Sequence, residues 1–177
     1  DFLHDLSPEL FNGIMQKTVG LLFSEKTPVN YSTRMSFQLT DEGYEKGWVH
    51  HDTSVSSITA IVYLTPGAYS GTSLYLKNNI TLCNDSIYAE QKIESFKTKN
   101  INSDLRTKHN NQYSESISVK GLYNRMFLFE SHMYHAAHEF FGDTPDTSRL
   151  TLVYFIDFTA PISQLPIIRS NRMGAGI

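Results

Sequence analysis

Two histidine-bearing segments have the residue types and the spacing that a metal site needs. The first contains His50, His51 and Asp52 in succession. On an extended backbone alternate side chains share a face, so His50 and Asp52 could reach one ion while His51 points the other way. Short motifs of this kind also arise often by chance, so the pair needs a third ligand from elsewhere in the chain before it indicates a site.

The second segment offers three imidazoles, those of His132, His135 and His138. One of them would complete a set of two histidines and one carboxylate. Such a set occupies one face of an octahedral ferrous ion and leaves three positions open for a chelating ligand and dioxygen. His135 is the preferred candidate because it lies in the most strand-like part of the segment, beside the small Ala136 and Ala137. The alternative is that all three histidines are packed or lie on the surface.

A third polar element follows at the start of a predicted strand. Arg149 and Thr151 share one face of this strand, and a guanidinium there suits bidentate binding of a carboxylate. An inward-pointing arginine is costly to bury without an anion. An edge arginine that pairs with Asp143 or Asp146 avoids this cost, and the local sequence by itself favours that interpretation.

These residues must be positioned by the surrounding elements, which are mainly short strands. Ser7, Pro8 and Glu9 mark the start of an amphipathic helix that should run to about Ser24. Alternating and β-branched runs, separated by turn residues, then predict strands at residues 35–39, 58–64, 73–76, 117–119, 125–129, 134–135 and 150–156. This pattern is typical of a β-sandwich or jelly roll that packs against the helix.

Two parts of the chain depart from the strand pattern. Between Lys77 and Ser116, a short helix could start at Asp85-Ser86 and run to about Phe96, and the polar stretch from Lys97 to Ser114 follows it. We expect residues 77–116 to form either a solvated surface excursion or a flap beside a site. Residues 161–177 are expected to form a C-terminal tail.

Composition limits the classes of protein to consider. The chain of 177 residues, 40% hydrophobic and 19% charged, is expected to form one globular domain over residues 1–177. Its net charge of -3 argues against general nucleic-acid binding, and no apolar run is long enough for a membrane span. The single Cys83 favours a reducing compartment, and we therefore expect a cytoplasmic protein. Because the chain begins at Asp1 rather than at a methionine, the sequence leaves open whether a targeting segment precedes it.

Taken together, the candidate residues resemble the motif set of the iron(II)- and 2-oxoglutarate-dependent dioxygenases, in the prolyl 4-hydroxylase-like branch. That family has a His-x-Asp motif after an early strand, a distal histidine, and a basic residue about one strand later. Here the matching residues are His50, Asp52, His135 and Arg149. The separation of fourteen positions between His135 and Arg149 is toward the long end of the family's range.

The flanking segments support the same resemblance over about residues 31–157. Residues 61–65 are similar to the family's strand ending in Tyr-Leu-Asn, and residues 71–74 to its Gly-Gly-x-Leu strand, with Thr72 at the second glycine. Residues 124–129 are similar to its Asn-Arg-Leu-Val-Leu-Phe strand, and residues 131–135 to its Ser-x-x-x-His motif. Residues 77–116 have no clear family counterpart.

The resemblance implies a double-stranded β-helix (jelly roll) with an N-terminal helix, and an oxygenase that hydroxylates an unactivated C–H bond. Its cofactors would be Fe(II), 2-oxoglutarate as cosubstrate and O2, with ascorbate as a candidate reductant, and its products succinate and CO2. It implies a metal site of His50, Asp52 and His135. It also implies a cosubstrate site of Arg149 and Thr151, with accessory contacts from Tyr63 and Leu74. From the sequence alone, without the resemblance, Tyr63 and Leu74 are better explained as packed core residues.

The substrate could be a peptidyl residue or a small molecule, and the sequence indicates no oligomeric state. Two other functions are compatible with the same strands. A cupin-like metalloenzyme that uses no keto acid would share the fold but would have no use for Arg149. A non-enzymatic jelly-roll binding module would have histidines that are merely packed or exposed.

Overall fold

The structure, a computed structural model, describes residues 2–23, 29–52, 58–78, 90, 92–94, 97–98 and 102–158. The predicted helix start at Asp85-Ser86 and the predicted tail at residues 161–177 lie outside these residues.

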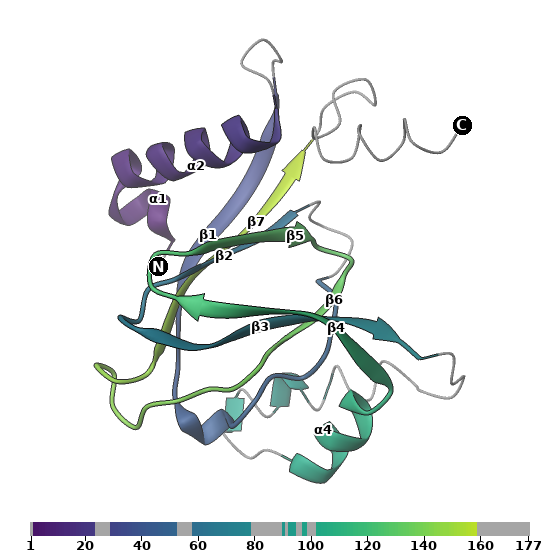
Figure 1. Ribbon diagram of the computed structural model, residues 1–177. Helices are drawn as coiled ribbons and strands as arrows, with labels where there is room; N and C mark the ends of the chain where they lie inside the picture. Colours follow the sequence, from purple (N-terminus) through teal and green to yellow (C-terminus); the bar gives the residue numbers. More distant parts are fainter. Residues whose placement is uncertain are drawn as a thin grey trace, which may run out of the picture.

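The strands of the described chain form two antiparallel sheets (Figure 1). The larger sheet has the strand order β1 (Tyr31–Thr40), β7 (Arg149–Phe158), β2 (Ile58–Tyr63) and β5 (Met126–Glu130). The smaller sheet has the order β4 (Tyr113–Leu122), β3 (Ala68–Lys77) and β6 (Tyr134–Ala137). The mainly β class with flanking helices is therefore confirmed. Each predicted strand is present, although β3 begins five residues earlier than its prediction and β4 is longer at both ends.

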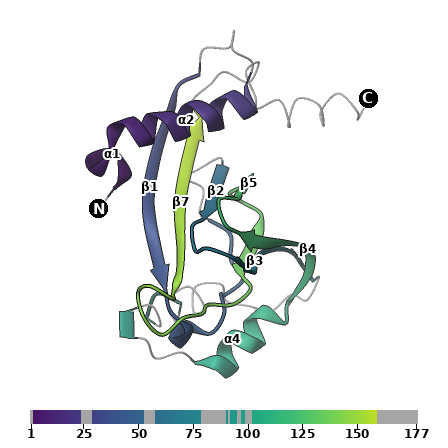
Figure 2. The ribbon, with the colours of Figure 1, turned by 60° about the vertical axis from the view of Figure 1, so that its left-hand side comes forward.

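Helices cover the outer face of the larger sheet. Helix α2 (Pro8–Leu22) begins where the sequence predicts, with the Ser7 hydroxyl accepting a hydrogen bond from the amide of Leu10. A short helix α1 (Leu3–Leu6), which the sequence analysis did not predict, precedes it, and a 3-10 turn η1 (Glu42–Tyr44) follows β1. Figure 2 shows α2 lying across β1 and β7. No helix in the described ranges is long and apolar enough to cross a membrane.

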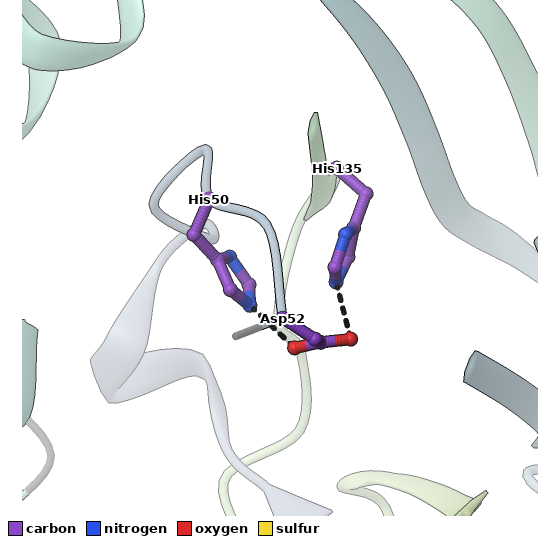
Figure 3. Close-up of side chains that lie close together, drawn as sticks. All are labelled: His50, Asp52 and His135. Carbon is purple, nitrogen blue, oxygen red and sulfur yellow. Dashed lines mark ion pairs between the residues drawn. The ribbon is translucent and has the colours of Figure 1, made fainter. Parts of the chain in front are cut away.

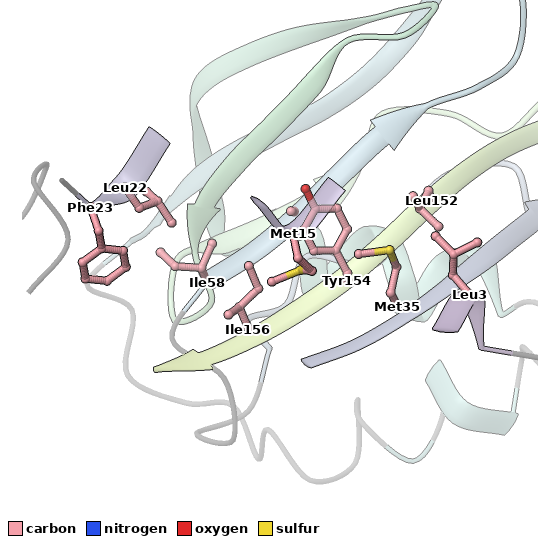
Figure 4. Close-up of a cluster of buried hydrophobic side chains, with 10 residues drawn as sticks. Leu3, Met15, Leu22, Phe23, Met35, Ile58, Leu152, Tyr154 and Ile156 are labelled. Carbon is pink, nitrogen blue, oxygen red and sulfur yellow. The ribbon is translucent and has the colours of Figure 1, made fainter. Parts of the chain in front are cut away.

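The main core lies between α2 and this sheet. Met15 and Leu22 from α2 meet alternate residues of the strands, and the ten buried members of this cluster are drawn in Figure 4. Because side chains alternate along a strand, the intervening residues of β2 and β7 face the other sheet. Ile61 and Val153 belong to a second buried cluster on that inner face. The polar side chains of the candidate site start from this same face.

A further helix that the sequence analysis did not predict lies between β3 and β4. Helix α4 (Ser103–Asn110) lies in the stretch that the sequence analysis left as a polar excursion or flap. Its Arg106 and His109 are buried, so these eight residues do not form a solvated surface excursion. A signal was present in the sequence: Asn102 caps the helix, its side-chain oxygen accepting a hydrogen bond from the amide of Leu105 at 2.9 Å.

Candidate metal centre

Backbone pairing brings the two histidine-bearing segments together. The amide of His50 donates to the carbonyl of His135 at 3.0 Å, and the amide of His135 donates to the carbonyl of His50 at 2.7 Å. The amide of Asp52 donates to the carbonyl of Ser131 at 2.9 Å. Residues 50–52 therefore run antiparallel to β6 and the turn before it, which sets the imidazoles side by side on one face.

The three predicted ligands meet at one point (Figure 3). The ligand atoms of His50, Asp52 and His135 all lie within 4.8 Å of one another. The Nε2 atoms of His50 and His135 are each 3.6 Å from a different oxygen of the Asp52 carboxylate. The arrangement that the spacing predicted is thus present in the fold, with donor atoms converging as a bound cation requires.

Hydrogen bonds on the far side of each ring determine which nitrogen is available. The Nδ1–H of His50 donates to the carbonyl of Trp48 at 2.8 Å, and the Nδ1–H of His135 donates to the carbonyl of Met133 at 2.9 Å. In a neutral imidazole the other nitrogen then carries a lone pair. Both Nε2 lone pairs face the negatively charged carboxylate of Asp52, and these groups repel one another. A cation bound between them would remove this repulsion. Such outer hydrogen bonds are usual for histidines that bind metals.

The electrostatic environment favours neutral imidazoles. Burial lowers the pKa of His50 well below 6.5, and the positive charge of Lys92 lowers it further. Burial also lowers the pKa of His135, partly offset by the negative charge of Asp52. Because a metal must compete with protons for an imidazole, a lowered pKa keeps both ligands available at neutral pH.

The carboxylate of Asp52 accepts a hydrogen bond from one hydroxyl, which a second hydroxyl contacts in turn. Thr59, on the inner face of β2, donates a hydrogen bond to Oδ2 of Asp52 at 2.6 Å. The Ser131 hydroxyl lies 2.9 Å from that of Thr59 and can donate to it. Sequence analysis included Ser131 in the Ser-x-x-x-His motif but missed Thr59. The alternation of β2 could have revealed it, since it places a buried threonine between two core residues.

The remaining histidines of the two segments lie away from the centre. His51 is exposed, as the alternation predicted. His132 pairs with Glu130 at 3.1 Å, and His138 lies 3.7 Å from Glu115. The choice among the three imidazoles of the second segment is therefore made by geometry, in favour of the one in β6.

Helix α4 supports the segment that leads to His50. Arg106 is 1% exposed, and its guanidinium donates to the carbonyls of Tyr44 and Lys46 at 2.9 and 3.2 Å. It also forms an ion pair with the carboxylate of Glu45. Three consecutive residues of an irregular connection are thus tied to one buried side chain.

The last turn of α4 continues this support toward the metal ligands. The side-chain oxygen of Asn110 accepts a hydrogen bond from the amide of Val49 at 2.9 Å, and its amide group donates to the carbonyl of Gly47 at 3.0 Å. The Nε2–H of His109 donates to the carbonyl of Val49 at 2.6 Å. The residue directly before His50 is therefore held by two side chains that the sequence analysis missed.

A cavity of about 170 Å³ joins the three ligands to Arg149. Its polar lining includes Gln38, Thr59, Thr72 and Lys92, and its apolar lining comes mainly from Trp48, Ile61, Phe140, Val153 and Phe155. Burial lowers the pKa of Lys92 to about 8. Sequence analysis did not single out Lys92.

Arg149 is buried but has no ionic partner among the described residues. It is 5% exposed, and its guanidinium lies 5.8 Å from the ring centre of Tyr63 and 5.7 Å from that of Phe140. In the part of the chain that the structure describes, its Nε has no hydrogen-bond partner. It pairs with neither Asp143 nor Asp146, so the interpretation as a surface ion pair is wrong. Burial of the unpaired charge lowers its pKa.

The other predicted cosubstrate residues are buried but do not line the cavity. Thr151 is completely buried, and its hydroxyl has no partner among the described residues. Tyr63 pairs with Thr151 across β2 and β7, and its hydroxyl donates to Thr72 at 2.9 Å. Leu74 is buried opposite His135 in the register of β3 and β6. The structure places Arg149 in the cavity with the three candidate ligands and leaves Thr151, Tyr63 and Leu74 outside its lining.

Comparison with known proteins yields one match. Residues 12–156 match the model of DUF6445, described as a family of unknown function. None of the curated proteins and none of the solved structures matches the chain. The matched span includes every residue of the candidate metal centre together with Arg149. The chain belongs to the DUF6445 family.

Proposed function

We propose that this member of the DUF6445 family is an Fe(II)- and 2-oxoglutarate-dependent oxygenase that hydroxylates an unactivated C–H bond and produces succinate and CO2. The observation that carries the proposal is the position of Arg149. It is a buried guanidinium without a described counter-ion, and it faces the same cavity as two histidines and a carboxylate. The metal ligands supply one half of such a site, and Arg149 supplies the other.

The donor set suits a ferrous ion. Two imidazole nitrogens and one carboxylate can occupy one face of an octahedral ion and leave the other positions for ligands. The lone pairs of His50 and His135 already point toward Asp52, so little reorganisation is needed on binding. When bound, the ion with dioxygen supplies the oxidising power for C–H hydroxylation, coupled to decarboxylation of the keto acid.

The part of the cavity at Arg149 suits a dicarboxylate. A planar guanidinium binds a carboxylate through two parallel hydrogen bonds. The rings of Tyr63 and Phe140 restrict the orientation of Arg149, and the buried Thr151 hydroxyl is a further donor nearby. A keto acid bound to the metal at one end would then neutralise the buried charge of Arg149 at the other.

The apolar wall contributes to the same chemistry. Ile61, Val153 and Phe155 line the cavity between the metal ligands and Arg149. By excluding water they strengthen the electrostatic interactions of the charged groups within. The chain thereby holds the cosubstrate in one orientation and keeps the reacting centre dry.

We also infer that the fold is a double-stranded β-helix. In chain order β1 and β2 belong to the larger sheet and β3 and β4 to the smaller one, after which β5, β6 and β7 alternate between the two sheets. Residues 47–52 run beside β6 through the bridge between His50 and His135 and supply a fourth strand to that sheet. Two four-stranded antiparallel sheets connected in this order correspond to a jelly roll.

The competing functions differ in their use of Arg149. A cupin-like metalloenzyme without a keto acid would leave this buried charge unneutralised, which is costly. A binding module without a metal would have no need for the converging lone pairs of His50 and His135. Both features favour the oxygenase.

The proposal can be tested by anaerobic titration of the purified protein with Fe(II) and then with 2-oxoglutarate. We expect a visible charge-transfer band from the keto acid chelated to the iron, and succinate after oxygen is admitted. Arg149→Met should abolish the response to 2-oxoglutarate but retain iron. The control Arg34→Met removes an exposed arginine of β1 and should change neither iron binding nor the response to 2-oxoglutarate. Iron binding without any response to 2-oxoglutarate would contradict the proposal and favour the cupin-like alternative.

A further inference from the structure

Thr72 is a polar side chain of the cavity to which the proposed function assigns no role. It lies on β3, is 1% exposed, and lines the cavity together with the three candidate ligands and Arg149. In the register of β3 and β6 it pairs with Ala137, which lines the same cavity. Directly paired residues of antiparallel strands present their side chains on one face, so the strand register also places Thr72 on the cavity side of its sheet.

The hydroxyl of Thr72 has a proton that it can donate. Its oxygen accepts a hydrogen bond from the Tyr63 hydroxyl at 2.9 Å. A hydroxyl group that accepts one hydrogen bond can still donate another. Within the described ranges of the chain no acceptor takes the proton of Thr72. This proton is therefore available to a ligand in the cavity.

Thr72 also lies between Tyr63 and the cavity. The resemblance implied a direct contact between Tyr63 and the cosubstrate, but Tyr63 is outside the cavity lining and its hydroxyl ends on Thr72. Thr72 occupies the second glycine position of the family's Gly-Gly-x-Leu strand. The side chain that meets the tyrosine hydroxyl here is thus absent from the family pattern.

The position of Thr72 matches the cosubstrate end of the cavity. The guanidinium of Arg149 lies 5.8 Å from the ring centre of Tyr63, whose hydroxyl contacts Thr72. Along β3, Thr72 is two residues from Leu74, which pairs with His135. Two residues of a strand span about 6–7 Å. A keto acid that binds the metal at one end and Arg149 at the other would therefore carry its second carboxylate close to Thr72.

We propose that the Thr72 hydroxyl donates a hydrogen bond to the second carboxylate of 2-oxoglutarate, and that Tyr63 acts on the cosubstrate only through Thr72. This inference rests on the proposed function and specifies which residues select its cosubstrate. Thr72 is then a specificity-determining residue, because its hydroxyl favours 2-oxo acids with a second carboxylate. Tyr63 is a positioning residue, since its hydrogen bond orients the hydroxyl of Thr72.

Binding can be measured without turnover. The protein is loaded with Zn(II), which does not react with oxygen, and titrated calorimetrically with two ligands. One is 2-oxoglutarate, and the other is 2-oxopentanoate, which has the same carbon chain with a methyl group in place of the second carboxylate. A hydrogen bond from Thr72 to that carboxylate affects only the first ligand, whereas a distorted cavity affects both.

We expect Thr72→Val to weaken the binding of 2-oxoglutarate about tenfold or more, as the loss of a hydrogen bond to a charged group predicts. The binding of 2-oxopentanoate should stay unchanged. Thr72→Ser keeps the hydroxyl and should retain most of the affinity. Tyr63→Phe should cost less than Thr72→Val, because it leaves the Thr72 hydroxyl in place. The matched control Thr107→Val removes an exposed hydroxyl of α4, outside the cavity, and should bind both ligands as the wild type does.

Two results overturn this inference. In the first, Thr72→Val binds 2-oxoglutarate as tightly as the wild type, or binds both ligands equally more weakly, so that Thr72 only shapes the cavity wall. In the second, Tyr63→Phe costs as much as Thr72→Val or more, which assigns the contact to the tyrosine. The proposed function is tested separately by the wild-type titration. If 2-oxoglutarate fails to bind there, the function itself is wrong, whereas binding that Thr72→Val leaves unchanged contradicts only the role of Thr72.

Discussion

His50 and His135 exchange both of their backbone hydrogen bonds, at 3.0 and 2.7 Å, although 85 positions separate them in the chain. Their ring centres lie 4.4 Å apart. Directly paired residues of antiparallel strands present their side chains on the same face. Asp52, two positions after His50, lies on that face as well, so one pairing interaction determines the position of all three ligands.

The first prediction concerns the ligands themselves. His50→Gln, Asp52→Ala and His135→Gln should each lower the affinity for Fe(II) or Mn(II) by at least about a hundredfold, because loss of an outer partner alone costs ten- to hundredfold. Isothermal titration under anaerobic conditions measures the affinity. His51→Gln is the control, since His51 is exposed and lies outside the ligand group. Equal affinities of Asp52→Ala and His51→Gln would exclude this centre.

The second prediction concerns the hydroxyl that orients the carboxylate. Thr59→Val keeps the shape of the side chain but removes the 2.6 Å hydrogen bond to Asp52. The affinity for Mn(II) should fall by about ten- to hundredfold. Thr59→Ser retains the hydroxyl and should restore most of the affinity. If the valine and serine variants bind Mn(II) equally well, the hydroxyl has no part in positioning Asp52.

The third prediction separates stability from binding at Arg149. The guanidinium of Arg149 is 5% exposed and has no described ionic partner. Arg149→Met should therefore raise the free energy of unfolding of the cosubstrate-free protein by about 1 kcal/mol. The reason is that the desolvation cost of the buried charge exceeds the stabilisation from its contacts with aromatic rings. Chemical denaturation measures the change.

The same variant should lose stabilisation by 2-oxoglutarate. In the metal-loaded wild-type protein, saturating 2-oxoglutarate should raise the melting temperature, whereas Arg149→Met should show no rise. A destabilised Arg149→Met protein that still responds to 2-oxoglutarate would mean that the arginine is a structural residue.

The fourth prediction concerns the support from helix α4. Arg106→Met removes two hydrogen bonds to backbone carbonyls and the ion pair with Glu45. The free energy of unfolding should fall by about 2–4 kcal/mol, because the carbonyls of Tyr44 and Lys46 lose their charged donor. Arg125→Met provides the control, since the guanidinium of Arg125 donates one exposed hydrogen bond, to Lys120. Similar losses in the two variants would contradict a special role for Arg106.

The fifth prediction concerns pH. The folded-state pKa values of His50 and His135 lie below the ordinary value of 6.5, first of all because of burial. Below pH 6.5 the unfolded chain therefore binds more protons than the folded chain, and the metal-free protein should lose stability as the pH falls. Denaturation at several pH values measures this loss. The double variant His50→Gln/His135→Gln should show a smaller dependence, and an unchanged slope would show that other groups cause it.

Much of the candidate centre could be predicted from residue types and local periodicity. The alternation within residues 50–52 predicted that His50 and Asp52 share a face, and the strand-like position of His135 favoured it over its neighbours. The structure groups these three side chains, and their role as metal ligands stays a prediction. For Arg149 the local sequence alone favoured a surface ion pair, because burial of an unpaired charge is costly, and only the family resemblance placed this residue in a cosubstrate site. In the structure Arg149 lies instead beside the rings of Tyr63 and Phe140 and lines a cavity, and no local pattern reveals either of these surroundings.

Helix α4 shows a different limit. Its residues are nearly all polar, so hydrophobic periodicity could not identify it. It packs through the buried side chains of Arg106 and His109, which bind the backbone of residues 44–49. Such partners become visible only when the chain is folded.

The amino-acid sequence by itself determined which donor atoms are available and on which face of each strand they lie, because alternation is a property of the extended backbone. It also determined the helix that covers the larger sheet, through its Ser7 cap and apolar stripe. Only the tertiary structure decided that His50 pairs with His135 and that Lys92 and Arg149 line the cavity next to these histidines. It also decided that α4 holds the segment that leads to His50. These relationships depend on hydrogen bonds and packing between distant segments, whose register no local pattern specifies.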